Sequence, residues 1–434
     1  MGWKRFATRL WLWCKSRVTA YHGALTKDFN YSSDFFFGLD FLMVTAGIRF
    51  RSDNVNLQRC WNIYRWLIYC PLPVALWNTY LGVKRGESFV NLLNSMQAIL
   101  CVVISSVRWA LIIWQYEPLM EIKRYLNGKQ FGRNLDQSLG IRSAVFYQIR
   151  TIVIRAIGCM CAFTVTVPAL DISNHHYLKL PFDVREHFPC VQFLVEKSYF
   201  IWIFGILMLI VLVYLLFFMI LTVLTAEANI TALAFSAVLD STRKRVDLKL
   251  QMEPGNSRQF EAKTKYYFWK FLQEEVGKCV QQHVDFLAMK NKIKLLLNAS
   301  FLVIYYLTTL SLASGAIYLS QMTSVTIFSL HTLSYCLWIA FECGSLTRLV
   351  DLLTDASESI GWAMYELAWP TELQYDERFQ AEYRSVREAM AIVMTVSQQP
   401  LGFDCFGLFE FNLERFYELL NMAYSFYTFL RDFV

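Results

Sequence analysis

Long apolar runs separated by polar and basic connections dominate the hydropathy pattern of this chain. An α-helix needs about 20 apolar residues to cross a hydrocarbon core about 30 Å thick. A shorter apolar segment at 35–50 comes first and predicts a helix that lies on the membrane surface or dips into it. The pattern predicts an all-α membrane protein with seven transmembrane helices, at 57–83, 89–114, 151–172, 199–225, 295–320, 324–347 and 411–433.

Two polar connections continue the helical pattern beyond the membrane. Apolar positions in 226–294 recur at helical spacing on both sides of the break EPGNS at 253–257. Segment 355–394 has a similar amphipathic pattern, which Pro400 and Gly402 end before the last span. We expect these helices to project from the membrane and to pack together as an anchor region.

The basic residues orient the predicted spans. Thirty of the 41 Lys and Arg residues lie in one set of connections, namely the N-terminal segment and residues 117–150, 226–294 and 348–387. The opposite set, together with the end of the chain, carries six. Because Lys and Arg are enriched in cytoplasmic loops, we expect a cytoplasmic N-terminus and an extracellular C-terminus. This orientation is the reverse of that of a G-protein-coupled receptor.

These patterns divide the chain into six parts. They are a cytoplasmic N-terminal part with the membrane-surface helix (1–56), spans one to four (57–225), a cytoplasmic helical extension (226–294), spans five and six (295–347), cytoplasmic anchor helices (348–410) and the last span (411–434).

Composition and motifs exclude several functional classes. Charged residues make up 18% of the chain, against about 25% in an ordinary soluble domain. The sequence has no Gly-rich phosphate loop, nucleophile elbow or paired-Cys motif, so we expect no enzyme and no cofactor. Glu275, Cys279 and His283 recur every four residues, but helix packing explains them better than a metal site does. The basic residues flank spans, which favours lipid contact over nucleic-acid binding.

The last predicted span carries polar groups that a lipid anchor does not need. At its inner end, Glu410, Glu414 and Glu418 share a stripe that would form an acidic ring in a symmetric oligomer or pair with nearby Lys and Arg. Further along, hydroxyls and a carboxylate alternate with bulky aromatic groups, as in a pore with a dry constriction and a polar rim. A lipid-facing aromatic belt is the alternative. The pore candidates are Tyr424, Thr428, Phe429, Asp432 and Phe433.

Four other spans carry bulky side chains and few charges in their outer halves. A gap between these helices would hold a small, mostly apolar molecule with one or two polar handles, whereas ordinary interhelical packing explains each residue singly. The ligand-binding candidates in spans two, three, four and six are Met96, Gln97, Phe163, Thr166, Trp202, Phe204, Phe328 and His331.

Two stretches near the end of the chain carry a family resemblance. They are SESIGWAMYELAWPTE and SQQPLGFDCFGLFEFNLERFYELLNMAYSFYTFLRD, and QQHVDFLAMKNKIKLLL and LPFD fit the same style. Together they resemble the insect odorant receptor family, in particular its ligand-tuning subunits. The resemblance implies a ligand-gated, non-selective cation channel of four subunits in the plasma membrane of olfactory sensory neurons. A tuning subunit would bind a small volatile molecule between helices two, three, four and six, and would assemble with the odorant receptor co-receptor as a heterotetramer.

Details of the tail bear on which member of the family this chain resembles. Matching it to the co-receptor's terminal pattern puts the hydrophobic constriction at Phe429 and Phe433 and the polar pore position at Asp432. The co-receptor has aliphatic residues and an uncharged amide there, and a longer connection between spans four and five, so the resemblance favours a tuning subunit. The alternative is a gustatory receptor, with the same fold and channel mechanism. Its usual tail has Thr-Tyr followed by Gln-Phe, where this chain has Ala423-Tyr424 and Leu430-Arg431.

Overall fold

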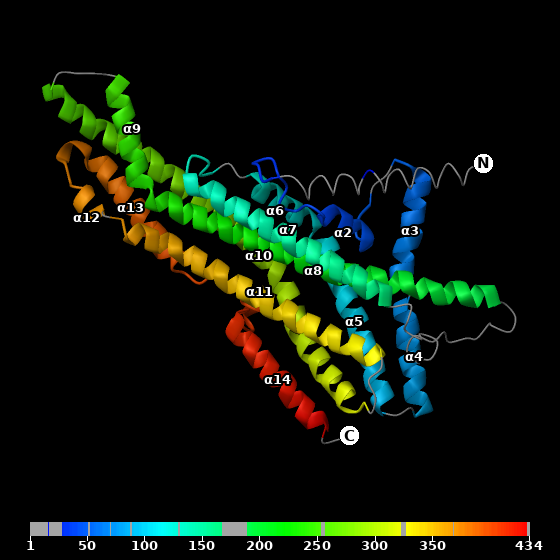
Figure 1. Ribbon diagram of the computed structural model, residues 1–434. Coiled ribbons are helices and arrows are strands. Elements are labelled where there is room, and N and C mark those ends of the chain that lie inside the picture. Colours follow the sequence, from blue (N-terminus) through cyan, green and yellow to red (C-terminus); the bar gives the residue numbers. More distant parts are fainter. Residues whose placement is uncertain are drawn as a thin grey trace.

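The computed structural model describes residues 16, 28–50, 53–69, 71–86, 89–128, 131–166, 189–252, 257–322, 327–367 and 369–431. Regular structure in these residues is helical (Figure 1). The α-helices are α2 (Leu39–Thr45), α3 (Val55–Tyr69), α4 (Pro71–Arg85), α5 (Phe89–Trp114), α6 (Tyr116–Gly128), α7 (Asp136–Thr166), α8 (Pro189–Ser236), α9 (Val238–Met252), α10 (Ser257–Ser320), α11 (Ile327–Tyr365), α12 (Trp369–Glu372), α13 (Gln380–Ser397) and α14 (Leu413–Arg431). Two short 3-10 helices, η3 (Glu377–Phe379) and η4 (Cys405–Gly407), complete the list.

Three helices are much longer than a membrane is thick. Helices α8, α10 and α11 contain 48, 64 and 39 residues. At 1.5 Å per residue the longest measures about 96 Å, roughly three times the thickness of a hydrocarbon core. Helices α7, α8 and α11 lie alongside one another in Figure 1, and α10 bends away from them towards α14. Much of the length of α8, α10 and α11 must therefore lie outside a membrane.

Helix α8 forms the centre of the molecule. Its segment Phe204–Ser236 has a mean hydropathy of 3.1, the highest of the candidate spans. Nearly every side chain from Met208 to Leu224 is buried, including Leu209, Leu215 and Leu221. A helix that is apolar on all sides lies in a protein core or spans a membrane, and the burial of these side chains shows that protein surrounds this part of α8. Accordingly, α8 contacts α2, α3, α5, α6, α7, α10 and α11.

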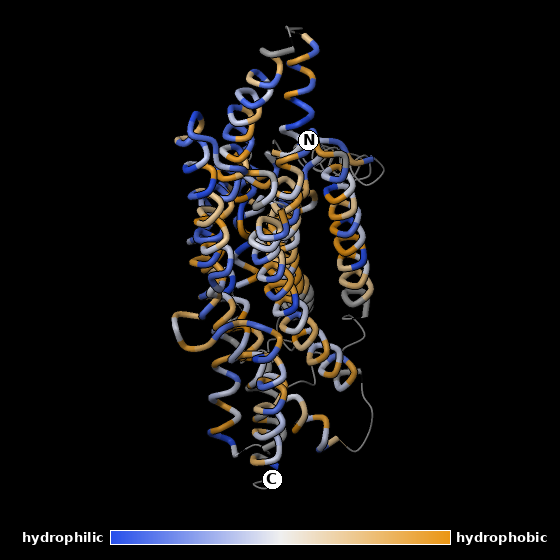
Figure 2. Tube along the Cα trace, turned by 90° about the vertical axis from the view of Figure 1, so that its left-hand side faces the viewer, coloured by the Kyte–Doolittle hydropathy of each residue, from blue (hydrophilic) through white to orange (hydrophobic). Residues whose placement is uncertain are grey.

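At one end, the long helices join short ones in what we call the distal bundle. It consists of α9, α12, α13, the first half of α10 and the last turns of α8 and α11 (Figure 1). Figure 2 shows hydrophilic residues among the hydrophobic ones on α9 and the start of α10. Arg245 of α9 binds Glu274 and Glu275 of α10, and its guanidinium lies 4.3 Å from the centre of the Phe271 ring. Ion pairs and an apolar core together hold this bundle.

Three described helices are long and apolar enough to cross a membrane, and they contain Gln137–Ala162, Phe204–Ser236 and Phe260–Ser320. A fourth candidate is the pair Ile99–Trp114 and Tyr116–Gly128, which is bent by 68°. The predicted first span falls on α3 and α4, of 15 residues each, which lie on either side of residue 70, a position outside the described residues. The predicted sixth and last spans fall on α11 and α14, which carry polar and charged residues. The structure thus supports several helical spans, and the count of seven stays a prediction.

Candidate functional site

The predicted ligand-binding residues lie on helices that meet at α8. Met96 and Gln97 belong to α5, Phe163 and Thr166 to the end of α7, Trp202 and Phe204 to α8, and Phe328 and His331 to the start of α11. Helices α5, α7 and α11 all contact α8. In Figure 1 the start of α5, the end of α7 and the starts of α8 and α11 lie on the side away from the distal bundle.

The structure describes the side chains of two of these eight residues, Phe204 and His331. Both are half-buried, and Phe204 packs against the central hydrophobic core. Ser329 and Thr332 of α11, next to His331, are buried hydroxyl residues. The side chains of Met96, Gln97, Phe163, Thr166, Trp202 and Phe328 lie outside the described residues.

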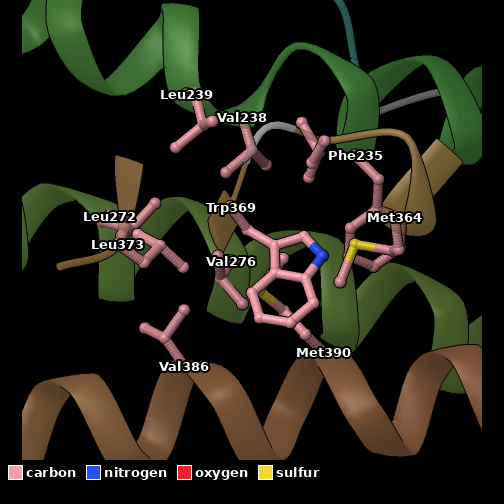
Figure 3. Close-up of a pocket in the computed structure, with 11 residues that line it drawn as sticks. Phe235, Val238, Leu239, Leu272, Val276, Met364, Trp369, Leu373, Val386 and Met390 are labelled. Atoms are coloured by element: carbon pink, nitrogen blue, oxygen red, sulfur yellow. The ribbon is translucent and has the colours of Figure 1, made fainter. Parts of the chain in front are cut away.

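A small space of about 10 Å³ lies in the distal bundle, remote from the predicted ligand-binding residues (Figure 3). The indole of Trp369 projects among apolar side chains from α8, α9, α10, α11 and α13. Ligand pockets usually enclose about 300–1,000 Å³ and include a few polar groups. This space is smaller and apolar, so it marks a junction of helices. Its lining residues are Phe235, Val238, Leu239, Leu272, Val276, Met364, Leu367, Trp369, Leu373, Val386 and Met390.

The last helix, α14, packs through one face only. Leu419 and Ala423 are buried on the side that faces α10 and α11. Tyr424 is 66% exposed and Phe429 is 59% exposed. Thr428 is half-buried, and its hydroxyl donates to the Ser425 carbonyl at 2.9 Å. The predicted pore residues Asp432 and Phe433 lie outside the described residues.

One of the three glutamates of the predicted acidic stripe at the start of α14 forms an ion pair with a basic residue. Glu418 binds Arg415 of the same helix. Glu410 and Glu414 are exposed. Among the residues that the structure describes, Glu418 is the glutamate of this stripe that forms an ion pair.

The turn that follows the predicted break at Pro400 and Gly402 holds the start of α14 against α10, a contact that the sequence did not predict. Asp404 accepts hydrogen bonds from Lys294 Nζ at 3.1 Å and from Asn298 Nδ2 at 2.9 Å. The hydrogen bond with Lys294 and its charge hold the pKa of Asp404 below its usual range. Cys405 and Phe406 adopt positive φ angles of 43° and 64°, a conformation that residues other than glycine rarely take. The sequence FDCFG at 403–407 was the available signal.

Two further contacts fix the same helix start. The ring of Phe411 stacks on Phe301 of α10 with centroids 4.0 Å apart. Asp351 of α11 accepts a hydrogen bond from the backbone N–H of Leu413 at 3.2 Å. An acceptor at this position satisfies one of the free N–H groups at a helix N-terminus. The first turn of α14 is thus bound to both α10 and α11.

The Glu275, Cys279 and His283 series belongs to helix packing. Glu275 binds Arg245, and burial raises the pKa of the Cys279 thiol to about 12. Burial, and then the charge of Lys290, lower the pKa of His283. Among the residues that the structure describes, no group of three or more His, Cys, Asp or Glu side chains could hold a metal ion.

Two buried ion pairs join helices that are far apart in sequence. Arg108 of α5 contacts Glu342 of α11, and Arg142 of α7 contacts Glu227 of α8. Charged residues are rare within apolar helices because burying a charge is unfavourable, and those that occur are usually functional. The sequence showed the charges but not which of them pair.

These features define a helical, multi-pass membrane protein with a central apolar helix, a distal helical bundle and a last helix open on one side. Residues 88–424 match the family described as 7tm odorant receptor, so the chain belongs to the insect odorant receptors, a family of non-enzymatic, ligand-gated channels. The resemblance to this family is therefore confirmed, and so is the expectation that the chain is no enzyme.

Solved structures show the same fold. The insect olfactory receptor OR5 from Machilis hrabei in complex with eugenol superposes with a TM-score of 0.67 and 12% identity, over 91% of this chain and 97% of that chain. The same receptor described without eugenol gives a TM-score of 0.61 and 12% identity, over 90% and 96% of the two chains. No curated protein matches by sequence.

Proposed function

We propose that this protein is the odorant-tuning subunit of a ligand-gated, non-selective cation channel. It assembles with the odorant receptor co-receptor as a heterotetramer in the plasma membrane of olfactory sensory neurons. The observation that carries this proposal is the one-sided packing of α14. A terminal helix fixed at its base and open along the side that bears Tyr424 suits a helix that shares a pore with other subunits.

The orientation follows from the basic connections. A cytoplasmic N-terminus puts the distal bundle inside the cell, where its helices contact neighbouring subunits, and directs α14 outwards. Asp432 and Phe433 then lie at the extracellular end of the pore, beyond Tyr424, Thr428 and Phe429. The chain is a tuning subunit because its tail departs from the co-receptor pattern at these positions.

The ligand is a small volatile organic molecule. It binds among Met96, Gln97, Phe163, Thr166, Trp202, Phe204, Phe328 and His331, whose helices all contact α8 or belong to it. The M. hrabei receptor was solved with eugenol, which supports a ligand of similar size. Half-buried His331, with Ser329 and Thr332 beside it, supplies a polar handle in an otherwise apolar surrounding.

The test is electrical recording from cells that express this subunit with and without a co-receptor. The panel of ligands contains eugenol and small volatile alcohols, aldehydes and esters. We expect ligand-evoked cation currents only with the co-receptor, and His331→Ala should raise the EC50 with unchanged surface expression. A subunit that responds alone, or a C-terminal tag that antibodies reach only after permeabilisation, would contradict the proposal.

A further inference from the structure

The Arg108–Glu342 pair is deeply buried but incompletely formed. The two side chains are 4% and 1% exposed. A single nitrogen, Arg108 Nη1, contacts both carboxylate oxygens, at 3.0 Å to Oε1 and 3.1 Å to Oε2. Only the contact with Oε2 has the geometry of a hydrogen bond, and the contact with Oε1 is an ion-pair distance. Arg108 Nε and Glu342 Oε1 therefore have no hydrogen-bond partner among the described residues. Removing two charges from water is unfavourable, and a one-nitrogen contact offsets less of this free energy than a two-nitrogen contact does.

The second buried pair provides a comparison within the same chain. Arg142 binds Glu227 through two nitrogens, with Nε 2.9 Å from Oε1 and Nη2 2.7 Å from Oε2. Its Nη2 also donates to the Phe131 carbonyl at 3.0 Å. This is the planar, two-nitrogen geometry for which arginine is suited. Arg142 Nη1 has no hydrogen-bond partner among the described residues, but both oxygens of Glu227 accept a hydrogen bond from Arg142. The chain thus has one pair with a two-nitrogen contact and one with a one-nitrogen contact.

The incomplete pair lies on a polar seam between α5 and α11. Seven residues before Arg108 and Glu342, about two turns of helix, the hydroxyl of Tyr335 interacts with the thiol of Cys101. One turn further in the same direction are Gln97 of α5 and His331 of α11, both candidate ligand-binding residues. A change in the separation of α5 and α11 at the ligand site would therefore reach the Arg108–Glu342 pair along these two helices.

Glu342 is also close to the last helix. Two residues after it, Gly344 packs so tightly on Phe416 of α14 that an added Cβ would be 2.9 Å from the Phe416 Cζ. Asp351, about two turns further along α11, accepts the hydrogen bond from Leu413 at the start of α14. The segment of α11 that carries Glu342 therefore contacts the base of α14 directly.

We propose that Arg108 and Glu342 are positioning residues that couple ligand binding to α14. The one-nitrogen contact allows α11 to move against α5 by the 1–2 Å typical of helix shifts, while the charges stay paired. A movement that begins beside His331 then passes through Glu342 and Gly344 to Phe416. This inference rests on the proposed function, because it requires a ligand at the outer ends of α5 and α11.

The experiment is a double-mutant cycle on the receptor expressed with its co-receptor. The variants are Arg108→Gln, Glu342→Gln, both together, and the charge exchange Arg108→Glu with Glu342→Arg. Basal current and EC50 are measured with the panel volatile that gives the largest wild-type current, and surface protein is measured by biotinylation. We expect the double-Gln variant to reach the surface, because it leaves no unpaired charge. Its EC50 should change at least about fivefold, the lower end of typical coupling, or it should carry ligand-independent current.

The other variants separate coupling from a merely structural role. The EC50 effects of the two single substitutions should not add, and the charge exchange should return the EC50 towards wild type. As a matched control, Arg142→Gln with Glu227→Gln also leaves no unpaired charge, and its EC50 and basal current per surface receptor should equal those of wild type. If the double-Gln variant shows wild-type EC50 and basal current per surface receptor, the pair does not couple. A wild-type subunit without any ligand-evoked current would instead refute the proposed function, and the inference with it.

Discussion

Gly344 of α11 lies directly against the ring of Phe416 in α14. A Cβ added at Gly344 would be 2.9 Å from Phe416 Cζ and 3.0 Å from Cε1, distances below van der Waals contact. The absence of a side chain at this position lets the base of the last helix approach α11. Any displacement of α11 at this level must therefore move Phe416.

We expect Gly344→Ala to alter gating. Alanine favours the helical state over glycine by about 1 kcal/mol, so the fold of α11 itself should not weaken. The new methyl group must push the Phe416 ring, and with it the start of α14, away from α11. Coupling between sites changes by about 0.5–2 kcal/mol when such a contact is altered. The expected result in current recordings is an EC50 shift of about two- to thirtyfold.

Gly277→Ala is the matched control for this substitution. Gly277 is also within a long helix, α10, but nothing lies within 4 Å of a Cβ built there. Its EC50 should equal that of wild type. If Gly344→Ala behaves like Gly277→Ala, the contact with Phe416 does not influence gating.

Local sequence patterns predicted the long helices because their apolar runs are continuous. The run around Leu215 is apolar on every side, and it became the buried centre of the molecule. The run at 57–83 corresponds to α3 and α4, on either side of residue 70, which lies outside the described residues, so a single crossing there stays a prediction.

Partnerships between distant residues could not be predicted. Arg108 and Glu342 are 234 positions apart, and no local pattern shows which buried charges meet. The Asp404–Lys294 contact joins a turn to a helix more than 100 residues earlier. For the predicted ligand site, hydropathy indicated helices that all contact or include α8, but which side chains face a ligand depends on packing angles that one sequence does not contain.

Gly205→Ala should weaken the packing of α3 on α8. A Cβ at Gly205 would be 2.5 Å from Ile68 Cγ1, and Ile68 is fully buried. Overpacking of this kind costs about 1–3 kcal/mol. We expect a lower unfolding temperature for the variant in detergent. Adding Ile68→Ala should restore part of the loss, because it removes the atoms that collide. A double variant that is less stable than either single variant would contradict this explanation.

Asp404→Asn and Asp404→Ala should loosen the turn before α14 in two steps. Asn loses the charge interaction with Lys294 but keeps an acceptor for Asn298, whereas Ala loses both. Because the ion pair is half-exposed, its loss should cost no more than about 1 kcal/mol. The unfolding temperature should therefore fall slightly with Asn and further with Ala.

The pKa of Asp404 also predicts how this effect depends on pH. A carboxylate whose pKa is lowered in the folded state stabilises the fold above its unfolded pKa of about 3.9 and loses that contribution only as pH falls through the lowered value. The difference between wild type and Asp404→Asn should thus stay constant from pH 6 to pH 8. A difference that disappears within this range would show that another group is responsible.

His283 should make the distal bundle sensitive to acid. The side chain is 2% exposed, and its Nε2 has no hydrogen-bond partner among the described residues. Burial, and then Lys290, lower its pKa, so the folded protein binds a proton less readily than the unfolded chain. The stability contribution is complete above the ordinary pKa of about 6.5 and is lost as pH falls below it. We expect the unfolding temperature of wild type to fall between pH 7.5 and 5.5, and that of His283→Phe, which keeps the ring beside Phe286, to fall less. Equal decreases in the two proteins would show that His283 is not the group that titrates.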